Sequence, residues 1–160
     1  DFGLDRARFA AKGARYAVLL HATARPEKEW PEANWIALGK ALRRDGLELV
    51  LPWGTESERV RSERIASALT RARVPERAPL DAVAKLIAGA ELVVGVDTGL
   101  LHLAAALGVP LVAIFAGSKP VLTGPVGQGP IAVLGADGAP PSVDAVGKAV
   151  EGVADAKNQA

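Results

Sequence analysis

Short apolar runs alternate along this chain with longer segments in which hydrophobic residues recur at helical spacing. The runs are rich in β-branched residues and continuous, which is typical of strands buried on both faces of a parallel sheet. We predict strands at Tyr16–His21, Leu47–Pro52, Leu92–Val96, Leu111–Phe115 and Ile131–Leu134, and a shorter one at Ala72–Val74.

The amphipathic segments between these runs predict helices. They lie at Glu32–Arg44, Glu56–Leu69, Leu80–Ala90, Leu100–Leu107 and Val143 to about Ala154. Thr55 and Glu58 have the spacing of a capping box at the start of the second helix, whose inner face we assign to Val60, Ile65, Ala68 and Leu69. Asp1–Arg15 is polar and alanine-rich, and we interpret it as a lead-in segment.

Strands that alternate with helices predict an α/β fold with right-handed crossovers, namely a Rossmann-like, doubly wound parallel sheet of about six strands. We expect the domain to cover residues 16–155 and the strand order to be 3-2-1-4-5-6. This order places the loop after strand 1, His21–Trp30, beside the turn after strand 4, Asp97-Thr98-Gly99. A doubly wound sheet binds its ligand in the crevice at that point.

Composition narrows the class of protein. The chain has 160 residues, of which 49% are hydrophobic and 23% are charged, and its net charge of +1 gives no electrostatic reason to expect nucleic acid as a partner. There are no cysteines, which fits a cytosolic protein, and no apolar run approaches the ~20 residues that span a bilayer. Methionine is absent, even at position 1, so we expect a piece of a longer protein or an engineered domain.

The common catalytic signatures are missing from the sequence. No GxGxxG follows the first strand, and there is no Walker A motif, no HExxH and no serine in a nucleophile elbow. Neither His21 nor His102 has a metal-ligating partner four residues on, so we expect no metal site. The candidate chemistry therefore lies in the predicted crevice.

Each polar crevice residue has a functional and a structural interpretation. Lys28 either binds a phosphate or belongs to a solvated charged loop, and Glu58 either accepts the ribose hydroxyls of a nucleotide or only caps its helix. Similarly, His102 either donates to a phosphate or is structural, and Asp97 either binds sugar hydroxyls or caps the next helix. The tryptophans are expected to pack in the core or at its rim: Trp30, Trp35 and Trp53.

Three segments of the chain together resemble a known family. LLHATARPEKEWP, LPWGTESE and VGVDTGLLHLAAALGVP are similar to the bacterial lipopolysaccharide heptosyltransferases, the ADP-heptose-dependent family, and most of all to its heptosyltransferase I group. The similarity runs from Tyr16 to about Val150. The family has the GT-B architecture of two Rossmann-like domains, and this chain resembles the second, donor-binding half.

The resemblance implies a function for the full enzyme and roles for individual residues. The enzyme would transfer L-glycero-D-manno-heptose from ADP-heptose to Kdo by an inverting mechanism. It would need no obligatory cofactor, and the other half of the enzyme would supply the catalytic base. Lys28 and His102 would stabilise the leaving diphosphate electrostatically. The donor-binding residues implied are Thr23 and Lys28 near the diphosphate and heptose, Glu58 at the ribose, Ala78 at the adenine, Asp97 at the heptose, and Thr98, Gly99, Leu100 and His102 at the diphosphate.

The chain also departs from the family pattern. The half that supplies the acceptor site for Kdo-lipid A and the catalytic aspartate is absent, so we expect no transfer by this chain alone. Lys119 and Val121 replace a usual acidic residue and glycine, which weakens any case for donor contacts from Gly117–Gly124. Two alternatives remain: a non-catalytic Rossmann scaffold, isolated or engineered, that forms a homo-oligomer through its exposed cleft face, and a related heptosyltransferase with another acceptor. The full enzyme is expected in the cytoplasm, associated with the inner membrane.

Overall fold

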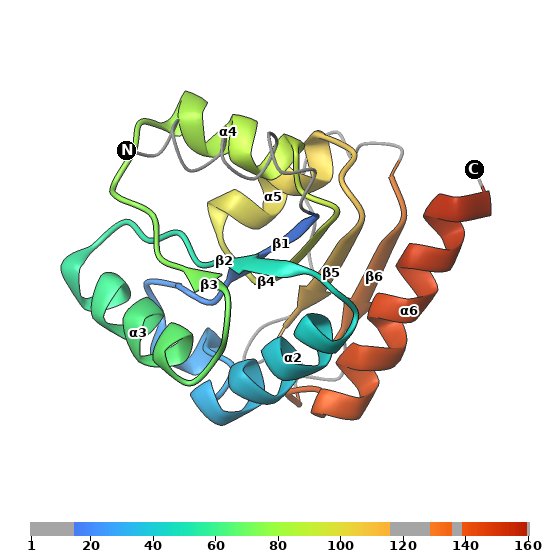
Figure 1. The fold of residues 1–160 in the computed structure, drawn as a ribbon, viewed down its shortest axis with the longest axis horizontal. Helices are drawn as coiled ribbons and strands as arrows, with labels where there is room; N and C mark the ends of the chain where they lie inside the picture. Colours follow the sequence, from blue (N-terminus) through green and yellow to red (C-terminus); the bar gives the residue numbers. More distant parts are fainter. Residues whose placement is uncertain (1–14, 116–128, 136–138, 160) are drawn as a thin grey trace.

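Helices cover both faces of a parallel β-sheet in the computed structural model, which describes residues 15–115, 129–135 and 139–159 (Figure 1). Within these residues the sheet has six strands in the order β3-β2-β1-β4-β5-β6, and every pairing is parallel. The predicted doubly wound α/β fold and its strand order are thus confirmed. The predictions for residues 1–14 and for Lys119, Val121 and Gly117–Gly124 lie outside the described residues.

The elements follow one another largely as the apolar pattern predicts. The strands are β1 (Tyr16–Leu20), β2 (Glu48–Val50), β3 (Ala72–Arg73), β4 (Leu92–Val96), β5 (Leu111–Ile114) and β6 (Ile131–Leu134). The helices are η1 (Pro26–Lys28), α2 (Glu32–Arg44), α3 (Glu56–Ser67), α4 (Leu80–Ala88), α5 (Gly99–Ala106) and α6 (Val143–Gln159). We did not predict η1, a single 3₁₀ turn, and α6 continues past Ala154 to Gln159.

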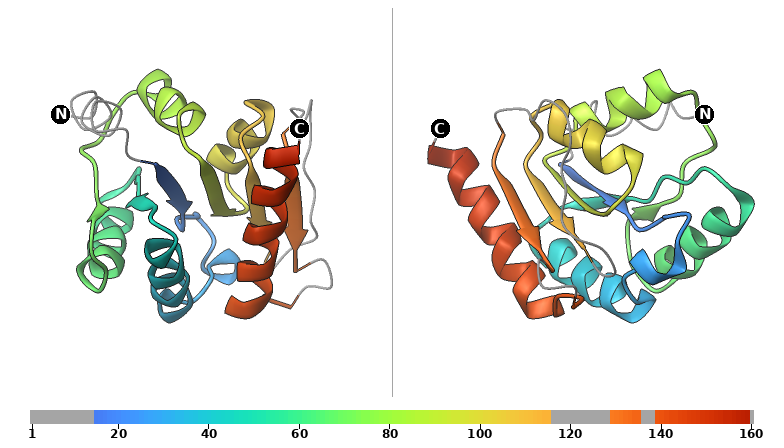
Figure 2. Two further views of the ribbon diagram at one scale, coloured as in Figure 1. Left: turned by 45° about the vertical axis from the view of Figure 1, so that its right-hand side comes forward. Right: turned by 180° about the vertical axis from the view of Figure 1, so that it is seen from behind.

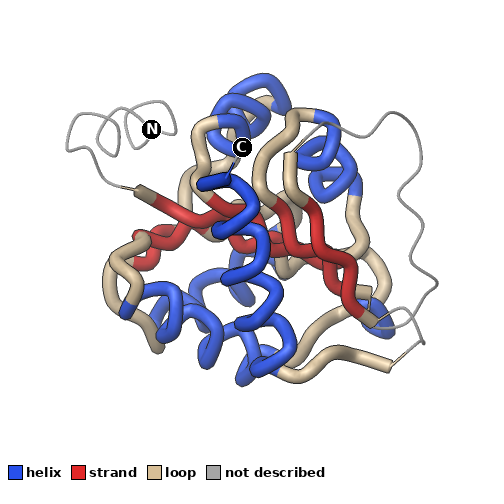
Figure 3. The backbone as a smooth tube through the Cα atoms, turned by 90° about the vertical axis from the view of Figure 1, so that its right-hand side faces the viewer, coloured by secondary structure: helices blue, strands red, loops and turns tan. Residues whose placement is uncertain are grey.

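The two faces of the sheet are packed by different helices. Figure 2 shows α2, α3 and α6 on one face of the sheet and α4 and α5 on the other, and Figure 3 shows helices on both sides of the strands. Side chains of β1 alternate between the two cores: Ala17 and Leu19 join the α2–α3–α6 side, whereas Val18 and Leu20 join the α4–α5 side. All five residues of β1 are buried, as expected for a central parallel strand.

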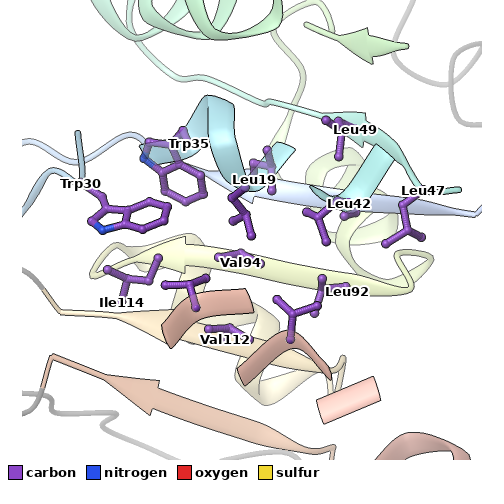
Figure 4. Packing of buried hydrophobic residues seen from close by; sticks show 14 of the residues in the cluster. Leu19, Trp30, Trp35, Leu42, Leu47, Leu49, Leu92, Val94, Val112 and Ile114 are labelled. Atoms are coloured by element: carbon purple, nitrogen blue, oxygen red, sulfur yellow. The ribbon is translucent and has the colours of Figure 1, made fainter. Parts of the chain in front are cut away.

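Trp30 and Trp35 anchor one end of the larger core. Both are fully buried, and their rings meet edge to face with centroids 5.1 Å apart. Figure 4 shows them beside a row formed by Leu19, Val94 and Val112, which are register partners on β1, β4 and β5. The core prediction is confirmed for these two tryptophans, while Trp53 is half-buried and lies at the rim of a pocket.

None of the helices in the described part of the chain combines the length and the apolar character needed to cross a bilayer.

Candidate functional site

A pocket of about 660 Å³ opens at the carboxyl ends of β1, β2 and β4. Its walls come from the loops that follow these strands and from the segment that precedes α4. This is the crevice where the strand order reverses between β1 and β4. The pocket brings together all of the residues for which the sequence predicted a binding role: Thr23, Lys28, Glu58, Ala78, Asp97, Thr98, Gly99, Leu100 and His102.

Asp97 lies between two basic side chains of the pocket lining, those of Lys28 and His102. Its Oδ2 is 2.8 Å from Nζ of Lys28, and its Oδ1 is 3.4 Å from Nε2 of His102. The side chains of Lys28 and Asp97 are each only 19% exposed, whereas the neighbouring loop residues Arg25 and Glu27 are exposed. Partial burial strengthens the attraction, because water screens the pair less than it would at the surface.

The start of α5 faces the same space. Thr98 is the N-cap, and its Oγ1 accepts a hydrogen bond of 3.2 Å from the backbone N–H of Leu100. The alternative that Asp97 caps this helix is therefore wrong. A Cβ placed on Gly99 would have no neighbour within 4 Å, so a ligand has room to approach the first N–H groups of the helix, which carry its positive partial charge.

Glu58 caps its helix and also lines the pocket. It completes the capping box with Thr55, and its Oε1 accepts hydrogen bonds from the N–H groups of Gly54 at 2.7 Å and Thr55 at 3.1 Å. The same carboxylate lines the pocket. The cap holds the side chain in one orientation, and the oxygen atoms still have lone pairs that can accept hydrogen bonds from the hydroxyl groups of a ligand.

The far wall of the pocket includes residues that we did not predict. Trp53 is tied to the segment before α4, because its Nε1 donates to the carbonyl of Pro75 at 2.7 Å. Arg77, Leu80 and Val83 complete this wall, and Leu80 is 67% exposed at the rim. Trp53 follows β2 closely in the sequence, and that position could have predicted a place for it in the pocket wall.

A buried polar network lies behind the pocket, and the sequence pattern did not predict it. His21 is fully buried; its Nδ1 is 3.0 Å from Nη1 of Arg61, and its Nε2 is 2.6 Å from Oγ of Ser62. Because a guanidinium only donates, Nδ1 accepts and the Nε2–H donates to Ser62. Burial, and after it the charge of Arg61, lowers the pKa of His21 to about 4, so the ring is neutral at pH 7.

This network corrects the inner face that we assigned to α3. Val60 and Ala68 are exposed, whereas Arg61, Ser62 and Ile65 are buried. Residues three and four positions before Ile65 share its side of a helix, so the spacing from Ile65 was the available signal.

The pocket suits a ligand that carries both anionic groups and hydroxyl groups. Lys28 and the start of α5 offer positive charge and donors, His102 offers a ring nitrogen, and Asp97 and Glu58 offer acceptors. Within the described residues, no cluster of three or more His, Cys, Asp or Glu side chains is placed to hold a metal ion.

Comparison with known proteins defines the class. The family described as glycosyltransferase family 9 (heptosyltransferase) matches residues 3–149. The chain therefore belongs to this family of glycosyltransferases, in agreement with the resemblance carried by its three sequence segments.

Individual relatives point to one group within the family. The chain is 45% identical over 139 residues to lipopolysaccharide heptosyltransferase 1 of Pseudomonas aeruginosa, an alignment that covers 86% of this chain and 39% of the relative. Its structure matches that of the Escherichia coli heptosyltransferase WaaC with ADP, with a TM-score of 0.78 and 36% identity, over 88% of this chain and 44% of WaaC. The match to WaaC with ADP-2-deoxy-2-fluoro heptose has a TM-score of 0.74 and 37% identity, over 87% and 43% of the two chains. The chain thus spans less than half the length of these relatives.

Proposed function

We propose that this chain is the ADP-heptose-binding domain of a lipopolysaccharide heptosyltransferase I. One observation carries the proposal: the loop with Thr23 and Lys28, the turn from Asp97 to Leu100, and Glu58 line a single pocket at the switch point of the sheet. The fold is similar to that of a heptosyltransferase solved with ADP, which supports a nucleotide-sugar ligand.

The polarity of the pocket suggests how the donor lies. We place the diphosphate at the start of α5, where backbone N–H groups and the side chains of Lys28 and His102 can donate to it. Glu58 would then accept the ribose hydroxyls, and the backbone near Ala78 would meet the adenine. Asp97, beside the diphosphate site, would accept hydroxyls of the heptose.

The proposed chemistry of the full enzyme is an inverting single displacement. The acceptor hydroxyl of Kdo loses its proton to a base and attacks the anomeric carbon, while the bond from that carbon to the diphosphate breaks and its electron pair leaves with ADP. Lys28, His102 and the start of α5 would stabilise the charge that develops on the diphosphate. In this proposal they act as electrostatic stabilisers, and none of them is the base.

We assign this role to residues 16–155, with residues 1–15 as a lead-in. The base and the acceptor site would belong to the part of the relatives that this chain does not cover. We therefore expect the 160-residue chain to bind the donor without transferring heptose.

Titration calorimetry with ADP tests the proposal directly. The wild-type chain should bind, and Lys28→Ala should weaken binding by roughly tenfold to a hundredfold, since a hydrogen bond to a charged group contributes about 1.5–3 kcal/mol. Lys40→Ala is the matched control, because Lys40 is an exposed lysine on α2 outside the pocket. No heat and no rise in melting temperature at millimolar ADP would contradict the proposal. Concentration-dependent self-association without ADP affinity would instead favour the oligomeric scaffold.

A further inference from the structure

The guanidinium of Arg61 binds both ends of the loop that carries Lys28. Nη1 donates to the carbonyl of His21 at 3.1 Å, and Nη2 donates to the carbonyl of Trp30 at 2.6 Å. Nε lies 3.2 Å from the Glu29 carboxylate and 3.5 Å from that of Glu32. Arg61 itself is only 9% exposed, so these contacts are made with little competition from water.

The loop between these two anchor points contains much of the pocket wall. Residues 22–29 include Thr23 and Lys28, and within them only the single turn η1 is regular structure. The carboxyl end of the loop has a second anchor in Trp30, whose Nε1 donates to the carbonyl of Pro141 at 2.9 Å. At the amino end, the bonds of Arg61 to the carbonyl and the ring of His21 hold the chain as it leaves β1.

Arg61 and Glu58 lie on the same helix, three residues apart, on consecutive turns of α3. The guanidinium therefore connects the helix that presents Glu58 to the loop that presents Lys28. These two side chains approach the pocket from different walls, and a ligand that contacts both requires their separation to be held constant.

The shape of the arginine head group explains why this residue type occupies the site. Two carbonyl groups and a ring nitrogen accept hydrogen bonds from its planar guanidinium, and the carboxylates of Glu29 and Glu32 lie beside Nε. A lysine ammonium is a compact point charge and cannot span both ends of the loop. If this residue only neutralised Glu29 and Glu32, a positive charge would be enough and the planar, branched guanidinium would not be needed.

We propose that Arg61 is a positioning residue for the nucleotide pocket: it fastens loop 22–29 to α3 and so fixes Lys28 relative to Glu58. The consequence for ligand affinity rests on the proposed function, whereas the fastening of the loop does not.

The test compares Arg61→Lys with Arg59→Lys. Arg59 lies on the same helix, but its ion pairs are with Glu56 and Glu63 of α3 itself. Hydrogen exchange of peptides from residues 22–29 should become faster in Arg61→Lys, with β4 and β5 unchanged, and ADP should bind about tenfold more weakly. Arg59→Lys should leave both measurements at the wild-type value.

A combination with Lys28→Ala separates positioning from general destabilisation. If Arg61 acts through the loop, Arg61→Lys should weaken ADP binding by less than about twofold once Lys28 is already absent. Should Arg61→Lys fail to fold, Glu29→Ala removes one loop anchor without leaving a buried charge unpaired, and it should also accelerate exchange at 22–29. Unchanged exchange in this loop for the folded variants overturns the inference. If the wild-type chain does not bind ADP, the proposed function fails, and the exchange measurement still decides the role of Arg61.

Discussion

Lys28 and Asp97 are 69 positions apart in the sequence, yet Nζ of Lys28 lies 2.8 Å from Oδ2 of Asp97. Their meeting follows from the sheet, because β1 and β4 pair in parallel with Leu20 opposite Gly95, and each side chain comes from the loop just beyond. The ion pair holds the ammonium group beside the start of α5, so Lys28 lies where the proposed diphosphate would bind.

Asp97→Asn should shift the binding preference of the pocket toward ADP and away from ADP-heptose. The substitution removes the charge that competes with a phosphate for Lys28, so ADP should bind about threefold more tightly, a modest gain in keeping with a partly exposed pair. ADP-heptose should gain less or bind more weakly, because the amide is a poorer acceptor for the sugar hydroxyls. Titration of the same variant with both ligands measures this, and equal changes in the two affinities would contradict the proposed placement of the sugar.

Glu58 has two roles that two substitutions can separate. Glu58→Ala removes the capping-box acceptor and should lower the free energy of unfolding by about 1 kcal/mol. Glu58→Gln retains a side-chain oxygen for the N–H groups of Gly54 and Thr55 and should be close to wild type in stability. Both should weaken ADP binding, because a neutral or missing acceptor binds the ribose hydroxyls less strongly.

A nucleotide that lacks the ribose hydroxyl groups provides the control for the proposed role of Glu58. Wild type should bind 2′,3′-dideoxy-ADP more weakly than ADP, whereas Glu58→Ala should bind the two nucleotides about equally. If Glu58→Ala still prefers ADP as strongly as wild type does, the ribose is recognised by another group.

The apolar pattern predicted which strands form, but placed several strand ends too far along the chain. His21, Leu51 and Phe115 are all fully buried, yet each lies just beyond the strand that we extended to include it. Leu51 and Phe115 each still donate a backbone hydrogen bond to the neighbouring strand, to the carbonyl groups of Arg73 and Leu134, so these predicted strands overrun the observed ones at the last bonds of the ladder. The single turn η1 escaped prediction because three residues are too few to show a helical period.

The pocket was predictable because the strand order brings distant loops together. The same order predicted that the loop with Lys28 lies beside the turn with Asp97. The network behind the pocket was not predicted, since an arginine and a serine on a highly charged helix look like solvated residues. Their burial depends on His21 and on two backbone carbonyls, which are partners that no local pattern reveals. Hydrogen bonds from a helix to carbonyl groups of a distant loop can be identified only from the three-dimensional structure.

Gly95 and Gly147 should respond to alanine in opposite ways. A Cβ on Gly95 would lie 2.9 Å from Cβ of Leu20 and 3.2 Å from Cδ1 of Leu101, so β1 and β4 would have to separate directly beneath the pocket. Gly95→Ala should therefore cost about 1–3 kcal/mol of stability. A Cβ added to Gly147, inside α6, would meet no atom within 4 Å, and Gly147→Ala should stabilise by roughly 0.5–1 kcal/mol. Chemical denaturation measures both values, and equal effects would contradict the close packing at Gly95.

The buried ring of His21 should make stability depend on pH. Its pKa is lowered to about 4 in the folded chain, by burial first and by Arg61 second, while an unfolded histidine has a pKa of about 6.5. Between these values the unfolded chain binds a proton that the folded chain excludes. The stabilisation is therefore complete above about pH 6.5 and is lost as the pH falls toward 4, by up to about 3 kcal/mol in total.

Urea denaturation of wild type and His21→Asn across pH 4–7 isolates this contribution. The variant should be less stable at pH 7, because it breaks the bonds to Arg61 and Ser62, but its stability should fall less steeply on acidification. The difference between the two proteins should shrink as the pH approaches 4, because only wild type loses the histidine contribution in this window. Curves that stay parallel from pH 6.5 to 4 would show that His21 titrates alike in the folded and unfolded chains, and that its burial does not hold the ring neutral.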